Sequence, residues 1–124
     1  MKNFFYNWLP VFIWAGLIFY LSDQPGLNSG MSAFWDVFLR KLAHAFVFAV
    51  LNFLIFLALR GQEFNYRKTI VWALALAILY AVSDEIHQGF VPEREGKIQD
   101  VGIDSLGIIF SSLAQIFFWQ RKKN

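Results

Sequence analysis

The fold is decided by the stretch LAHAFVFAVLNFLIFLAL, residues 42–59, in which only His44 and Asn52 are polar. A helix rises about 1.5 Å per residue, so this stretch would cover about 27 Å as a helix. The hydrocarbon core of a bilayer is about 30 Å thick, and a spanning helix satisfies its backbone hydrogen bonds internally. The stretch therefore predicts a transmembrane helix.

Three further apolar runs accompany this stretch, at residues 4–21, 69–83 and 103–119. Charged residues make up only 16% of the chain, against about 25% in soluble proteins. The first run is longer than the apolar core of a signal peptide and no small-residue cleavage site follows it, so we expect it to be retained. The sequence thus predicts an all-α membrane protein of one domain, a four-transmembrane-helix bundle. Its helices are expected at about residues 4–21, 38–59, 68–89 and 101–119.

The third run is short, because residues 69–83 would cover only about 22 Å of helix. We expect the helix to continue through residues 84–88 until Gly89 and Pro92 end it. This extension carries two carboxylates, an imidazole and a carboxamide. Ionisable side chains in the last turns of a membrane helix are costly unless they are paired, and they are functional candidates by default.

The positively charged residues are distributed unequally between the two sides of the predicted bundle. One side carries seven, namely Lys2, Arg60, Arg67, Lys68, Arg121, Lys122 and Lys123, and the other carries four, namely Arg40, Lys41, Arg94 and Lys97. The positive-inside rule therefore predicts an N-in/C-in topology. Charges beside spanning segments indicate topology rather than a nucleic-acid surface, so the expected partner is the lipid bilayer and no nucleic acid.

Polar residues recur with helical spacing at the ends of three predicted helices. Lys41 and His44 share one helical face, as do Asp84, His87 and Gln88, and Asp100, Asp104 and Gly107. We expect all three faces to lie at the outer membrane level. We therefore expect a ligand-binding site there. The candidates are Lys41 and His44 in the second helix, Asp84, Glu85, His87 and Gln88 in the third, Asp100 and Asp104 in the fourth, and Arg94 in the loop between the last two. Gly102, Ser105 and Gly107 are expected to let the helices approach closely.

Several short motifs run through these residues: KLAH at 41–44, SDEIHQ at 83–88, FVP at 90–92 with Arg94, DV at 100–101 and DSLG at 104–107, and more weakly LS at 21–22 with Pro25. In these motifs the chain resembles the VanZ-like family of bacterial membrane proteins. The resemblance implies a small multi-pass protein of the bacterial cytoplasmic membrane, and the family's named member is associated with resistance to the glycopeptide antibiotic teicoplanin. The family usually has Gly and another small residue on either side of the Arg, where this chain has Glu93 and Glu95.

Four interpretations of the candidate residues remain open. The favoured one is binding of a lipid or cell-wall precursor headgroup at the outer leaflet, because Arg and Lys bind phosphate and carboxylate. Acid–base chemistry by the carboxylates and histidines would instead make the protein a membrane-embedded enzyme, and the sequence leaves this open because no nucleophile is marked by spacing. Imidazoles and carboxylates are also metal ligands, but no H-E-x-x-H-like spacing is present, so the sequence assigns no metal and no cofactor. In the structural interpretation, of an accessory membrane subunit, the charges only hold the helices together.

Overall fold

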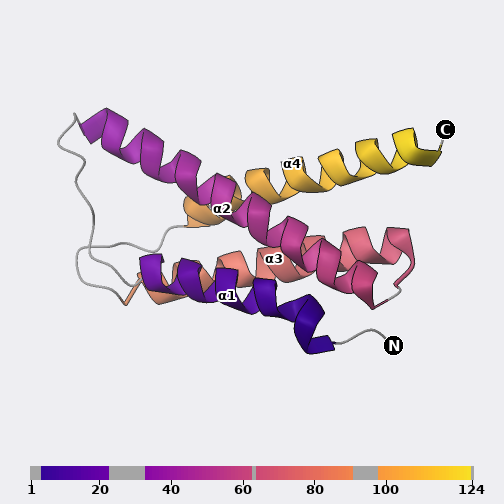
Figure 1. Ribbon diagram of the computed structural model, residues 1–124. Coiled ribbons are helices and arrows are strands. Elements are labelled where there is room, and N and C mark those ends of the chain that lie inside the picture. The colour runs from indigo at the N-terminus through magenta and orange to yellow at the C-terminus, as the bar shows by residue number, and fades with distance from the viewer. Residues whose placement is uncertain (1–3, 23–32, 63, 91–97, 124) are drawn as a thin grey trace.

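The computed structural model describes residues 4–22, 33–62, 64–90 and 98–123. All regular structure within these residues is helical: α1 is Phe4–Ser22, α2 is Ala33–Gly61, α3 is Tyr66–Gln88 and α4 is Ile98–Lys123. Each helix contains a stretch that is long and apolar enough to cross a membrane. The predicted class, an all-α membrane protein with four transmembrane-length helices, is confirmed. The start of α1 and the end of α4 lie at the same end of the bundle (Figure 1).

Two helices are longer than the sequence indicated. α2 begins at Ala33 rather than at residue 38, and α4 runs from Ile98 to Lys123. With 29 residues, α2 exceeds the length that a span needs, which is about 20 residues. Figure 1 shows its first turns extending away from the other helices. The first turns of α2 are mostly apolar, but Asp36, Arg40 and Lys41 interrupt the apolar run before residue 42, so the length of the run does not show where the helix begins.

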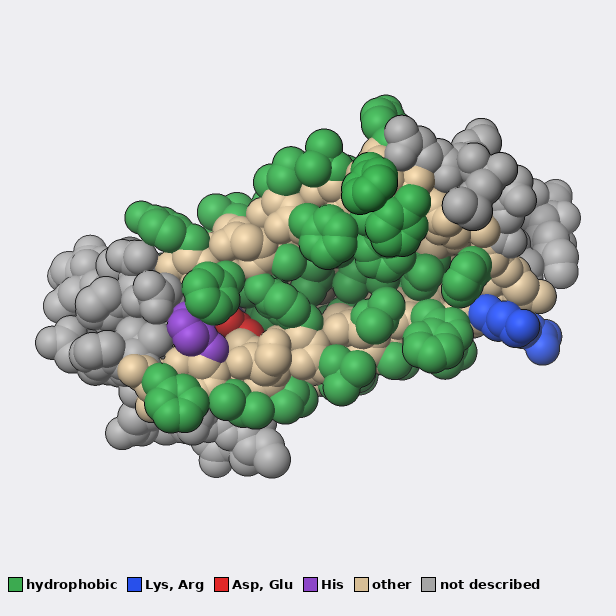
Figure 2. Space-filling view, turned by 90° about the horizontal axis from the view of Figure 1, so that it is seen from below, with side chains coloured by type: hydrophobic (Ala, Val, Ile, Leu, Met, Phe, Trp, Pro, Cys, Tyr) green, Lys and Arg blue, Asp and Glu red, His purple; other side chains and the backbone are tan. Residues whose placement is uncertain are grey.

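The bundle is organised around α2, which packs against each of the other three helices. α1 packs on α2 and α3 and, over the described residues, makes no contact with α4. Only 11% of the spanning stretch of α1 is buried, against 39% for α2. α1 is therefore the peripheral helix. On the face shown in Figure 2, hydrophobic side chains are spread over the described part of the surface, as expected for a protein that faces lipid.

The core between the helices combines large and small side chains. Phe48, Leu51 and Ile108 are almost fully buried, while α3 contributes alanines at every fourth position. Small residues on one helical face let neighbouring helices approach closely. The fully buried alanines of α3 are Ala73, Ala77 and Ala81.

The ends of α3 have local causes. At its start the Asn65 side chain accepts a hydrogen bond of 2.8 Å from the backbone N–H of Arg67, a typical N-cap. Its last residue is Gln88 and its C-cap is Gly89. The predicted extension of the third apolar run through residues 84–88 is thus confirmed, and it carries the polar residues to one end of the bundle.

One glycine lies at a close contact between α2 and α4. A Cβ atom at Gly107 would overlap the backbone carbonyl of Ala45, so only glycine allows this approach. Gly102, which the sequence grouped with Gly107, has open space where its Cβ would be. The expectation of close approach is therefore confirmed at Gly107 and wrong at Gly102.

Gly107→Ala is expected to destabilise the bundle by about 1–3 kcal/mol, because the added methyl group must push the α2 backbone away. The matched control is Gly102→Ala, which adds the same methyl group on the same helix into open space and should not destabilise. The free energy of unfolding of each purified variant, measured with denaturant in detergent, reports both effects. Equal losses in the two variants would contradict the assignment of Gly107 to the helix contact.

Candidate functional site

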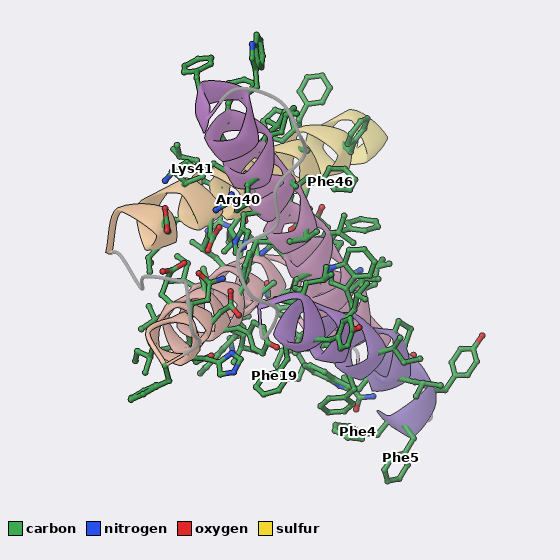
Figure 3. All side chains as sticks on the ribbon, turned by 90° about the vertical axis from the view of Figure 1, so that its left-hand side faces the viewer. Phe4, Phe5, Phe19, Arg40, Lys41 and Phe46 are labelled. Atoms are coloured by element: carbon green, nitrogen blue, oxygen red, sulfur yellow. The ribbon has the colours of Figure 1, made fainter. Side chains whose placement is uncertain are left out.

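The candidate residues that the structure describes gather at the end of the bundle where α1 and α3 end and α4 begins. α2 crosses this end with its first half. Figure 3 looks onto it, with Lys41 directed toward the first turns of α4 and Arg40 beside Lys41. The contacts described below run between α2, α3 and α4, which are far apart in the sequence and adjacent in space.

The outermost contact is an ion pair between α2 and α4. Lys41 Nζ lies 2.6 Å from Asp100 Oδ1, and the two side chains are 39% and 23% exposed. Arg40, the preceding residue, is exposed. This edge of the site is therefore open to its surroundings and carries both positive charges.

The next contact lies one helical turn deeper. His44 Nδ1 is 3.2 Å from Asp104 Oδ1, and the Asp104 side chain is only 1% exposed. The step from Lys41 to His44 and the step from Asp100 to Asp104 are each about one turn, so the two pairs form in register. A further turn along α4, Gly107 touches α2 and sets the distance between the helices.

α3 closes the site from the third side. Asp84, Glu85 and Gln88 are all buried there. Gln88 Nε2 lies 3.4 Å from both Asp84 Oδ2 and His44 Nε2. A carboxylate accepts and a carboxamide N–H donates, so these contacts favour the tautomer of His44 with its proton on Nδ1, facing Asp104.

Four of the candidates come together as one group. His44, Asp84, Glu85 and Asp104 each offer one atom that could ligate a metal ion, and these atoms all lie within 4.8 Å of one another. Three carboxylates and one imidazole at this distance can share protons, act as an acid–base pair or ligate a cation. We call these four residues the inner group.

His87 is not part of the inner group. Its ring stacks on Phe19 of α1, with ring centroids 4.4 Å apart and planes 14° from parallel. The sequence placed His87 on one face with Asp84 and Gln88, and the structure places it on the side of α3 that meets α1. Arg94, another predicted site residue, lies outside the described residues.

Other polar contacts were not singled out as candidates. Gln115 Nε2 donates to Asn52 Oδ1 at 2.7 Å, and the Tyr66 hydroxyl donates to the backbone carbonyl of Gln115 at 2.7 Å. Asn52 therefore bonds a neighbouring helix, as its isolation in an apolar run indicates. An apolar groove lined by residues that include Trp8 and Trp72 lies near the opposite end of the bundle, away from the inner group.

The fold and this site define a multi-pass membrane protein with a largely buried polar cluster at one end of its helices. The sequence model described as VanZ/LLP1 matches residues 4–119, nearly the whole chain. The chain therefore belongs to the VanZ/LLP1 family, and the resemblance noted in its motifs is confirmed. Comparison with curated proteins and comparison with solved structures each gave no significant match.

Proposed function

We propose that this protein spans the bacterial cytoplasmic membrane with both termini inside, and that its polar end binds an anionic headgroup at the outer leaflet. The ligand class is a phosphate-bearing envelope lipid or a lipid-linked cell-wall precursor. The proposal rests chiefly on one observation, the pairing of Lys41 with Asp100 at the open edge of a cluster that is otherwise largely buried.

The positive charges of the site are exposed at its edge and the carboxylates of the inner group are buried, which favours anion binding at the edge. Arg40 and Lys41 are accessible there, whereas the carboxylates of the inner group lie below them. A headgroup arriving from the membrane surface would meet the two cations first, and a guanidinium can hold a phosphate through two hydrogen bonds. The carboxylates would repel the same anion, so we place the headgroup at the edge.

Aromatic side chains support a position at the membrane surface. Phe34, Trp35 and Phe38, in the first turns of α2, are exposed, and their rings pack against one another. Tryptophan is enriched at the membrane–water interface, at the level of the headgroups. Lys41 is about one helical turn beyond Phe38, which leaves its ammonium within reach of a lipid phosphate.

Replacing Arg40 and Lys41 together by alanine is expected to weaken headgroup binding by at least about tenfold. Each hydrogen bond to a charged group contributes about 1.5–3 kcal/mol, and each 1.4 kcal/mol is a factor of ten. Binding of anionic lipid to the purified protein, measured by titration in neutral detergent, reports the change. The matched control is Arg67→Ala, which removes an exposed arginine at the other end of the bundle and should bind as the unchanged protein does.

The same variants connect the proposal to the cell envelope. We propose that loss of the gene changes teicoplanin susceptibility. A gene copy that encodes Arg67→Ala should restore the original susceptibility, and a copy that encodes the double variant should not. Undiminished lipid binding by the double variant, at normal abundance in the membrane, would overturn the headgroup proposal. Degradation of the double variant in cells, with no binding by the purified unchanged protein, would favour the structural interpretation.

A membrane-embedded enzyme is the second candidate, and the His44–Asp104 pair favours it. A carboxylate that fixes the tautomer of an imidazole leaves the other ring nitrogen free of its proton, which is the state of a general base. The lipid titration separates the two candidates when its products are analysed. Release of phosphate or of another fragment from the lipid would assign an enzyme, and saturable binding without any product supports a binding protein.

A further inference from the structure

We propose that His44, Asp84, Glu85 and Asp104 together bind one divalent metal ion, Zn²⁺ or Mn²⁺, between α2, α3 and α4. The inference goes beyond headgroup binding, because the protein alone would hold the ion. It also departs from the expectation drawn from the sequence, which assigned no metal. Ligand spacing along one helix was absent, whereas here the ligands come from three helices.

The distances within the inner group fit a single coordination sphere. Its four candidate ligand atoms lie within 4.8 Å of one another. Nitrogen and oxygen ligands bind Zn²⁺ at about 2.0–2.2 Å, so two ligands on opposite sides of an ion are at most about 4.4 Å apart. Small side-chain rotations would therefore bring all four atoms onto one ion.

Asp104 gives a second, independent indication of a ligand. The residue is fully buried, and within the described part of the chain its Oδ2 atom has no hydrogen-bond partner. Buried carboxylate oxygens accept hydrogen bonds or bind cations, because burial without either is costly. Since this carboxylate belongs to the inner group, a cation placed there would supply the interaction that Oδ2 lacks.

The orientation of His44 places an imidazole between the carboxylates of two helices. Nδ1 lies 3.2 Å from Asp104 of α4, and Nε2 lies 3.4 Å from Gln88 of α3. Asp84 Oδ2 is itself 3.4 Å from the same Gln88 nitrogen. The ring thus lies between α3 and α4, beside the carboxylates of the inner group. Ligation through Nδ1 would require this nitrogen to release its proton, and ligation through Nε2 would replace its contact with Gln88.

The chemistry of the ligands selects the ion. Three carboxylates and one imidazole form an oxygen-rich set with one nitrogen, and the chain contains no cysteine. Imidazole favours Zn²⁺ over harder ions, carboxylates bind both Zn²⁺ and Mn²⁺, and soft ions require sulfur. Mg²⁺ fits less well, because it prefers oxygen ligands and retains several waters.

The test uses the purified full chain in detergent, loaded with ZnCl₂ or MnCl₂ and then dialysed against metal-free buffer. Elemental analysis is expected to find about one ion per chain. Asp104→Asn keeps the shape of the side chain and removes its charge, and it should weaken metal binding by at least about tenfold. The matched control is Asp100→Asn, the same change one turn earlier on α4, at a residue outside the inner group. This control should keep the ion.

Thermal unfolding supplies a second measurement. The metal should raise the Tm of the unchanged protein and of Asp100→Asn, and should leave that of Asp104→Asn unchanged. His44→Gln serves as a second ligand variant in case Asp104→Asn does not fold. The proposal is overturned if the folded, unchanged protein retains neither metal, if both ligand variants retain it undiminished, or if Asp100→Asn loses it equally. No lipid ligand is present in this assay, so its result is separate from that of the headgroup titration.

Discussion

His44→Leu is expected to destabilise the folded bundle by about 1.5–3 kcal/mol, the usual cost of removing a hydrogen bond to a buried charged group. The substitution takes away the hydrogen-bonding partner of Asp104 Oδ1, while the carboxylate stays buried between the helices. The free energy of unfolding, measured in detergent with a chelator present, reports this cost without any contribution from bound metal.

A double-mutant cycle identifies the source of the loss. His44→Leu combined with Asp104→Leu removes both members of the pair and should recover much of the stability, because the Asp104 carboxylate is then no longer buried without that hydrogen bond. His87→Leu is the matched control, since His87 lies outside the inner group and stacks on Phe19. Loss of that ring contact should cost about 0.5–1.5 kcal/mol. If the double variant were as unstable as the sum of its single variants, the pair would not be the cause.

The number and type of helices could be predicted because the bilayer imposes a simple rule. A run such as residues 42–59 must be helical if it crosses hydrocarbon, whatever its neighbours are. The end of α3 could also be predicted, since the polar extension is followed by Gly89. The start of α2 at Ala33 could not, because Asp36, Arg40 and Lys41 interrupt the apolar run between Ala33 and residue 42.

The meeting of polar residues from three helices at one end of the bundle followed from helical spacing, but which of them belong to the inner group did not. Asp84 and His87 are three positions apart, yet His87 meets α1 while Asp84 joins the inner group. The rotation of α3 about its own axis decides which of these side chains faces α1 and which faces α2 and α4. Spacing within one helix does not determine that rotation. The same holds for Gly102 and Gly107, of which only the second meets α2.

Contacts between residues about sixty positions apart determine the chemistry of the site. His44 and Asp104 are separated by 60 residues, and Lys41 and Asp100 by 59. No local pattern encodes such a pairing, and for that reason the sequence offered no metal-ligand signature. Once α2 and α4 lie side by side, one register brings both pairs together.

Reporter fusions are expected to give an all-or-none pattern that fixes the orientation of the bundle. Fusions after Gln62 and after Lys123 should report the cytoplasm, and a fusion after Gly96 should report the opposite side. The physical reason is the distribution of Lys and Arg, with seven on the predicted inner side and four on the predicted outer side. An enzyme reporter that is active on only one side of the membrane provides the measurement.

The orientation matters because the polar end can meet only one leaflet. The apolar stretch of α2 that is long enough to span is Phe38–Gly61, with Lys41 near its start and Arg60 at its end. If α2 spans the membrane, the side of Arg60 therefore determines the side of the inner group. Charge reversal provides the control: replacing Arg60, Arg67 and Lys68 by glutamate should weaken the preference of this loop for the cytoplasm. If the unchanged protein instead reported Gln62 outside and Gly96 inside, the headgroup would have to come from the inner leaflet. The proposed role at the outer leaflet would then be wrong, while the metal proposal would stand, because the inner group is the same in either orientation.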